Sequence, residues 1–126
     1  MAVTDPRLGT QNPTECQRVG EVLARVGDKW TVLIINELGD GPRRFNTLRR
    51  QIEGVSQRML TLTLKNLERD GLVSRAVTPS VPPRVDYALT DLGRAMLVPV
   101  RALGRWAAAH IPQMDAARGR YDAAGR

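Results

Sequence analysis

Residues 54–72 read GVSQRMLTLTLKNLERDGL, and the rest of the chain is organised around this stretch. Ser56 is a good helix N-cap residue, and Gly71 is the residue type that most often ends a helix in the left-handed conformation. One narrow apolar stripe lies between them, with helical spacing, at Leu60, Leu64 and Leu67. The stretch therefore predicts a short helix that stops at Asp70 and has one buried edge.

The opposite face of this helix is mainly cationic. It carries Arg58, Leu62, Lys65 and Arg69, flanked by Thr61 and Asn66. A short helix with a buried edge and an outer face of cationic and amide-bearing side chains suits the major groove of DNA. The alternative is an ordinary amphipathic surface helix, and the neighbouring segments distinguish the two interpretations.

The composition favours a single basic domain with a polyanionic partner. The chain has 126 residues and a formal net charge of +6, with a sequence pI of about 10.7. Such a charge indicates nucleic acid before a membrane surface. No apolar run is long enough to span a bilayer, and residues 1–10 lack the apolar core of a secretion signal, so we expect a cytoplasmic protein. The single cysteine fits a reducing compartment.

Two longer helices are predicted in the first part of the chain. The first runs from Thr14, as its cap, to Val26, and the second covers residues 29–38 behind the cap Asp28. The second is apolar around most of its circumference, so we expect it to be the central core element. Residues 1–13 are interpreted as a flexible arm.

A short helix comes directly before the cationic one. Residues 43–45 are expected to form a short strand, after which Asn46 caps a helix over residues 47–52. A tight turn, residues 53–55, joins it to the cationic helix. Two short helices joined by three residues that include glycine make a helix-turn-helix, and the second is then the recognition helix.

A hairpin is predicted after the recognition helix. Residues 72–77 and 84–89 have the character of strands. The proline-rich segment 78–83 between them forms a long tip, because proline lacks the N–H that a helix or a central strand requires. A hairpin of this kind, next to a helix-turn-helix, is a wing.

The last predicted helix begins at the cap Thr90 and ends near Ile111. Pro99 is expected to kink or divide it, and residues 112–126 have no apolar period and are interpreted as a flexible tail. Residues 14–111 then form one domain. The element order predicts an α+β fold, mostly α: a winged helix-turn-helix with additional N- and C-terminal dimerisation helices.

The chain resembles the HxlR-type transcriptional regulators, a branch of the MarR-like winged-helix proteins. The resemblance rests on four segments in order, GDKWTVLIINEL, GPRRFNTLRRQI, GVSQRMLTLTLKNLERDGLV and PSVPPRVDYALTDLGR. It implies a homodimeric regulator in the bacterial cytoplasm, nucleoid-associated when it binds its partner, double-stranded DNA. It also implies a dimer interface between terminal helices, and the residues that we assign to this interface are Val19, Leu23, Met96, Val100, Leu103, Trp106 and Ala107.

The first turns of a recognition helix meet base edges, which makes Ser56, Gln57, Arg58 and Thr61 candidate DNA contacts. Arg58 can pair with guanine and Gln57 with adenine, although Gln57 can alternatively make a second capping contact. Leu62 departs from the polar residue usual at this place in the family. It either touches a thymine methyl group or is simply exposed to solvent.

Further cations are expected near phosphates. Lys65 and Arg69 lie further along the recognition helix and suit the DNA backbone. Arg49 and Arg50, on the preceding helix, either touch that backbone or form a solvated face. Arg84, at the base of the wing, either reaches the minor groove or its phosphates, or is an edge-strand arginine with no role in DNA binding.

Cys16 is the candidate for sensing a signal. It lies in the first turn of the first predicted helix, where the helix N-terminus stabilises a thiolate, while Glu15 beside it acts in the opposite direction. The resemblance implies a cysteine near this position that often senses oxidants or electrophiles. The alternatives are a small buried packing residue, and a regulator controlled by a small molecule in the dimer pocket instead.

Two other functions compete with a sequence-specific regulator. A winged-helix module that binds protein would not require aligned cations on residues 58–69, and a general architectural DNA binder would not discriminate between sequences. No catalytic set or phosphate loop is present at useful spacing, and His110 stands alone without metal-ligand neighbours. We therefore expect neither an enzyme nor a cofactor or metal.

Overall fold

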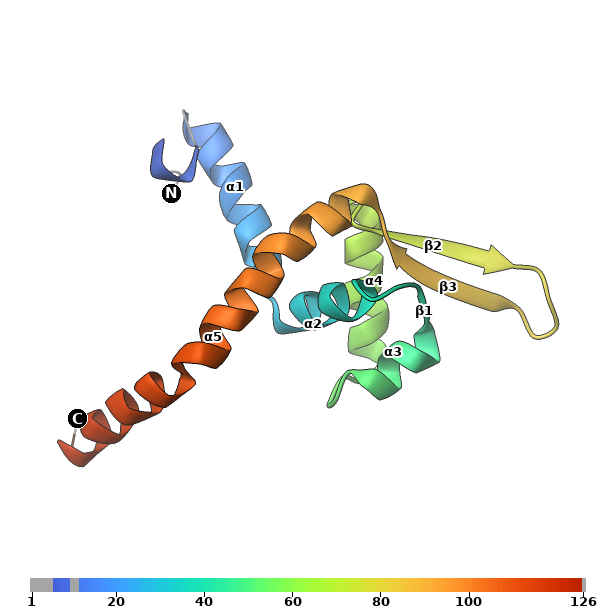
Figure 1. Ribbon diagram of the computed structural model, residues 1–126. Coiled ribbons are helices and arrows are strands. Elements are labelled where there is room, and N and C mark those ends of the chain that lie inside the picture. The colour runs from blue at the N-terminus through green and yellow to red at the C-terminus, as the bar shows by residue number, and fades with distance from the viewer. Residues whose placement is uncertain (1–5, 10–11, 126) are drawn as a thin grey trace.

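The computed structural model describes residues 6–9 and 12–125, and its elements are those of a winged helix-turn-helix (Figure 1). A single 3-10 turn, Pro6–Leu8, precedes the first helix. The elements that follow are α1 (Pro13–Val26), α2 (Lys29–Leu38), β1 (Arg43–Arg44), α3 (Phe45–Gln51), α4 (Gln57–Arg69), β2 (Val73–Thr78), β3 (Arg84–Leu89) and α5 (Asp91–Ala123). The rest of the predicted arm, residues 1–5 and 10–11, lies outside the described residues.

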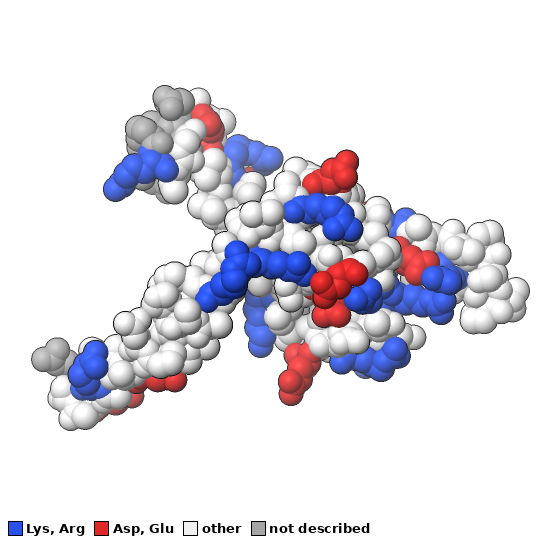
Figure 2. All heavy atoms as spheres, viewed as in Figure 1, with Lys and Arg blue, Asp and Glu red and all other residues white. Residues whose placement is uncertain are grey.

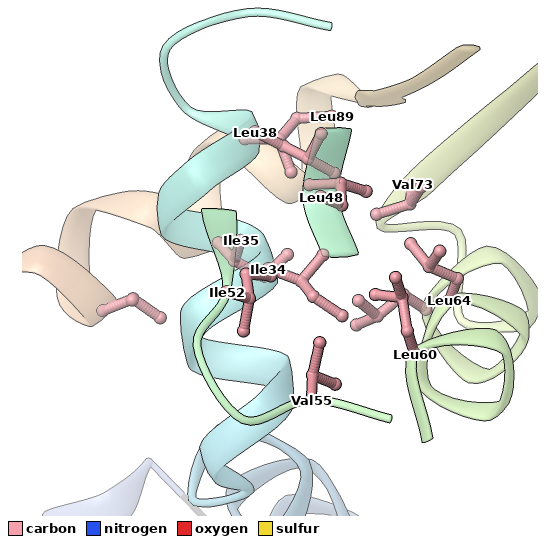
Figure 3. Close-up of a cluster of buried hydrophobic side chains, with 12 residues drawn as sticks. Ile34, Ile35, Leu38, Leu48, Ile52, Val55, Leu60, Leu64, Val73 and Leu89 are labelled. Atoms are coloured by element: carbon pink, nitrogen blue, oxygen red, sulfur yellow. The ribbon is translucent and has the colours of Figure 1, made fainter. Parts of the chain in front are cut away.

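The predicted core is confirmed, with α2 at its centre. Ile34, Ile35 and Leu38 of α2 are fully buried. Figure 3 shows their side chains pointing toward those of the helix-turn-helix and of the sheet. The other buried apolar side chains of this cluster are Leu48, Ile52, Val55, Leu60, Leu64, Leu67, Val73, Leu89 and Val100. One core therefore holds the helix-turn-helix, the base of the wing and the first third of α5 in fixed relation.

The wing is confirmed within one residue of its predicted bounds. β2 and β3 pair antiparallel from Val73 opposite Leu89 to Thr78 opposite Arg84. β1 joins on the other side of β3, so the strand order is β1-β3-β2 and all pairs are antiparallel. Figure 1 shows the hairpin extending away from the helices, which leaves its tip accessible.

Both ends of α4 form as the sequence predicts. The N–H of Met59 donates to Ser56 Oγ at 3.0 Å, which is an N-cap hydrogen bond. At the other end Gly71 has φ of +77°. The N–H of Leu72 donates to the Leu67 carbonyl at 2.9 Å, a hydrogen bond that closes the left-handed helix end.

Two predicted helix starts are each wrong by two residues. α1 is capped by Asn12, whose Oδ1 accepts from the N–H of Glu15 at 2.8 Å, and not by Thr14. Proline is well suited to the first helical position, so Pro13 extends the helix back to Asn12. α3 begins at Phe45 without a side-chain cap, because Arg44 leaves β1 in an extended conformation and the helix starts at once.

The predicted end of the last helix, near Ile111, is also wrong. α5 is a single helix to Ala123, and neither Pro99 nor Pro112 divides it. The segment after Pro112 is rich in alanine and arginine, which have high intrinsic helix propensity, so it is helical without an apolar stripe. Figure 1 shows this distal part projecting away from the domain. Across the described ranges, none of the helices has both the length and the apolar character needed to cross a membrane.

The start of α5 is locked against the start of β2. As predicted, Thr90 caps the helix: its Oγ1 accepts from the N–H of Gly93 at 3.1 Å and donates to the Gly71 carbonyl at 2.6 Å. The N–H of Thr90 donates to the Leu72 carbonyl at 3.1 Å. Gly93 is buried, and a Cβ atom there would collide with that same carbonyl oxygen. The backbone approach therefore requires glycine, and it ties α5 to the end of α4.

Candidate nucleic-acid interface

α4 has one buried and one exposed face, as its sequence pattern predicts. Leu60, Thr63, Leu64 and Leu67 are at most 4% exposed and pack into the core. The outward face carries the exposed side chains Arg58, Leu62, Lys65 and Arg69. Thr61, at the edge of this face, is half-buried. The helix is therefore fixed by its apolar edge and presents a row of long side chains to the surroundings.

The cations of this row have no internal counter-charge. Within residues 6–9 and 12–125, Arg58, Lys65 and Arg69 take part in no ion pair. Other arginines of the domain are neutralised locally: Arg25 Nε lies 2.9 Å from Asp70 Oδ2, and Arg43 Nε lies 3.8 Å from Glu37 Oε1. Unpaired exposed cations on one helix face form a site for a polyanion, because binding neutralises them and releases counterions.

The first turn of α4 is linked to α3 through Gln57. Arg49 Nη1 donates to Gln57 Oε1 over a long 3.5 Å, and both side chains are exposed. Gln57 makes no second capping contact in the described chain, since the cap is formed by Ser56. Arg50 instead donates to Thr47 within α3, also at 3.5 Å. Arg49 and Gln57 thus share one exposed edge, where the turn meets the recognition helix.

The wing presents a second set of exposed arginines. Arg84 pairs with Thr78 beside the tip of the hairpin, and not at its base as predicted. Its Nε lies 2.9 Å from Asp86 Oδ2 on the same strand, so its position is held while the side chain stays half exposed. Arg75 on β2 is exposed and unpaired in the described part of the chain. It is not among the predicted DNA contacts, although its place in the strand before the proline-rich tip indicates a position on the wing. Figure 2 shows basic side chains along the wing and none at its outermost tip.

A further residue missed by sequence reasoning is Met59. Its side chain is 37% exposed, and it lies three residues before Leu62 on α4, so the two are neighbours on the helix surface. Leu62 itself is 50% exposed. The outward face of α4 therefore combines cations with a small apolar area, which a helical projection centred on Leu62 would have shown.

The residues assigned to the dimer interface fall into three groups by their exposure. Leu23, Leu103 and Trp106 are more than half exposed, so they are uncovered in the single chain. Val100 is only 3% exposed and Met96 packs against the core, so these two belong to the interior of their own chain. The other two, Val19 and Ala107, are half-buried.

An open groove of about 740 Å³ lies between α1, the end of α4 and the start of α5. Its apolar lining consists of Val22, Val26, Leu72, Leu92, Ala95 and Met96. The Arg25–Asp70 ion pair crosses it and connects α1 to the C-cap of α4. A ligand in this groove would touch both a terminal helix and the recognition helix.

Cys16 lies two residues further into α1 than the cap predicted at Thr14 implies. Because Asn12 is the cap, the N–H of Cys16 donates to the Asn12 carbonyl at 3.0 Å. That amide is therefore used within the helix and is not one of the free N–H groups that attract an anion. The thiol is half-buried and is the one free cysteine of the chain.

A helix-turn-helix with a wing and an uncompensated cationic recognition helix defines a DNA-binding protein. Residues 25–115 match the HxlR-like helix-turn-helix family, and the chain belongs to that family. The matched part begins after Cys16, so the family match itself does not cover the thiol. The family and its members are transcriptional regulators, so this chain is a transcriptional regulator with a helix-turn-helix DNA-binding fold and is not an enzyme.

Individual relatives agree with this assignment. The chain is 45% identical over 98 residues to YtfH of Escherichia coli K12, an uncharacterized HTH-type transcriptional regulator, with 78% of each chain covered. The solved ytfH from Salmonella typhimurium has a TM-score of 0.75 at 44% identity, over 80% of this chain and 90% of that one. The redox regulator HypR in its reduced form has a TM-score of 0.74 at 37% identity, over 79% of this chain and 98% of that one.

Proposed function

We propose that this regulator acts as a homodimer that reads an inverted-repeat operator in the cytoplasm. The observation that carries the proposal is the outward face of α4, whose unpaired cations Arg58, Lys65 and Arg69 are held at the surface by a rigid buried edge. One recognition helix covers only part of a turn of DNA. Two of them, related by a two-fold axis, would meet successive major grooves about 34 Å apart.

The dimer is supported by apolar surface that the single chain leaves uncovered. Leu23 on α1 and Leu103, Trp106 and Ile111 on α5 are at least half exposed. Exposed apolar side chains gathered on two helices mark an interaction site more often than a solvated surface. A second copy presents the same side chains, so a two-fold contact would bury both sets together.

In this proposal some residues of α4 contact base edges and others contact phosphates. Arg58, with Ser56, Gln57 and Thr61, meets base edges from the first two turns. Lys65 and Arg69 neutralise phosphates, and Arg49 and Arg84 do so from α3 and the wing. Arg84 is already oriented by Asp86, so little side-chain freedom is lost when it binds.

The test is a selection of fragments from a random DNA pool, followed by gel-shift titration and light scattering. The expected result is a two-fold symmetric operator bound by a dimer. Arg58→Ala should weaken operator binding by about 1–3 kcal/mol and relax one base position. Arg94→Ala is the matched control, because Arg94 is an exposed arginine on α5. Equal losses in the two variants, or a monomer at micromolar concentration, would contradict the proposal.

For the signal we propose oxidants or electrophiles acting on Cys16. The support is its position on α1, next to apolar residues assigned to the dimer, together with the likeness to the redox regulator HypR. An adduct on this thiol would alter packing between subunits and so the separation of the two recognition helices. A disulfide between subunits would in addition require Cα atoms within about 7 Å, so we rank the adduct first.

A small-molecule effector is the second candidate, and the groove that contains the Arg25–Asp70 pair favours it. The two are separated by titrating the operator complex with diamide, quinone or hypochlorite, for wild type and for Cys16→Ser. A response of the wild type alone supports the thiol. Equal responses would mean that Cys16 is a packing residue and that the effector acts elsewhere.

A further inference from the structure

Leu62 stands out on the face that we propose to enter the DNA groove. It lies directly opposite the buried stripe of α4, with Arg58 one turn before it and Lys65 one turn after it. Its side chain is 50% exposed and does not pack against the core cluster. Met59, three residues earlier and beside Leu62 on the helix surface, adds a second partly exposed apolar side chain. An apolar area thus sits in the centre of a cationic row.

Neither a core role nor a protein partner accounts for this arrangement well. The core is formed by the other edge of α4. A protein surface that covered Leu62 would also have to remove water from Arg58, Lys65 and Arg69, which have no ion pairs among the described residues. Desolvating unpaired charges is costly. A duplex meets both demands at once, because its phosphates and guanine edges receive the cations while the groove floor receives the apolar side chain.

The floor of the major groove offers one apolar group, the C5 methyl of thymine. Leu62 is at the second turn of α4, close to the end of the helix that meets base edges. We infer that Leu62 is a specificity-determining residue that packs against the methyl group of a thymine in each operator half-site. This inference rests on the proposed DNA-binding function, and it adds the chemical group that is read.

Uracil differs from thymine in DNA only by the absence of this methyl group, so replacing thymine by deoxyuridine deletes one side of the contact. Leu62→Ala deletes the other side. Since Leu62 is exposed, this variant should fold like the wild type, which its unfolding midpoint will verify. The two deletions form a double-mutant cycle on operator affinity. If Leu62 contacts the methyl group, removing the methyl group should hardly change the affinity of Leu62→Ala.

The experiment takes the operator selected by the wild type and replaces its thymines by deoxyuridine, one symmetric pair at a time. At one symmetric pair, the affinity of the wild type for the operator should fall roughly threefold to fivefold for each methyl group removed. The affinity of Leu62→Ala should fall less than twofold when both methyl groups of that pair are removed. Arg58→Ala is the control: it binds more weakly, but it should keep the full effect of uracil at that pair.

Three results would overturn the inference while leaving the proposed function intact. They are a selected operator without thymine in its half-sites, uracil substitutions that leave wild-type affinity unchanged at every pair, and equal uracil effects in wild type and Leu62→Ala. A wild-type protein that selects no sequence at all would overturn the proposed function itself. The inference would then fail with it.

Discussion

Replacing Gly93 by alanine tests how closely α5 is fitted to the wing. The added Cβ would collide with the Leu72 carbonyl oxygen and would lie 3.1 Å from both the Leu72 carbonyl carbon and Leu89 Cδ2. The backbone carbonyl cannot move aside cheaply, because it also accepts the hydrogen bond from the N–H of Thr90. Overpacking costs about 1–3 kcal/mol and a broken hydrogen bond about 1 kcal/mol more, against a gain of about 0.5–1 kcal/mol in helix propensity.

The net expectation for Gly93→Ala is a loss of about 1–3.5 kcal/mol in the free energy of unfolding. The matched control is Gly104→Ala on the same helix, where a Cβ would have no atom within 4 Å. It should stabilise the protein by about 0.5–1 kcal/mol. Urea denaturation of the two variants and the wild type, at one protein concentration and followed by circular dichroism, gives all three values. If Gly93→Ala proved as stable as the wild type, the close backbone approach would not exist.

Three further outcomes follow from the contacts described above. Arg69→Ala should weaken binding to operator and random DNA alike and lower the salt slope by about one, as measured by gel shifts over a range of salt concentrations. Arg101→Ala should cost about 1–2 kcal/mol in urea denaturation, because Arg101 donates to the side chain and carbonyl of Asn36 and so ties α5 to the end of α2. Reversing the charge of Arg25 or of Asp70 alone should lower the free energy of unfolding by about 0.5 kcal/mol, and exchanging both charges should restore it, as a double-mutant cycle would show.

The sequence predicted the helix-turn-helix and the wing because each carries local signals that agree with the packing. Ser56 and Gly71 fix the ends of α4 through the side-chain cap and the left-handed backbone that each favours, and the apolar Tyr87 and Leu89, two residues apart on β3, both pack on the core. Such signals depend on a few neighbouring residues. They are therefore readable without knowledge of the fold.

The terminal helices were harder to predict, for different reasons. Apolar periodicity fails beyond Pro112, where α5 is maintained by helix propensity alone. The interior position of Val100 depends on how α5 crosses α2, which no local pattern encodes. The exposed face of α4 could be predicted, but the pairing of Arg49 with Gln57 could not, because it joins two helices across a turn.

The continuous α5 is a long helix that is packed at one end and projects at the other, so it can act as a lever. The helix spans 33 residues, and its fulcrum is the place where the buried Val100 and the hydrogen bonds from Arg101 to Asn36 fix it to α2, so the arm over residues 101–123 is about 35 Å long. A tilt of about 5° at that fulcrum would displace the far end by about 3 Å over such a length. Conversely, a displacement of several ångströms at the tip of α5 would correspond to a small rotation of this helix at its packed end. The length of the projecting arm thus sets the ratio between the displacement of the distal end of α5 and the rotation of the helix at its packed end.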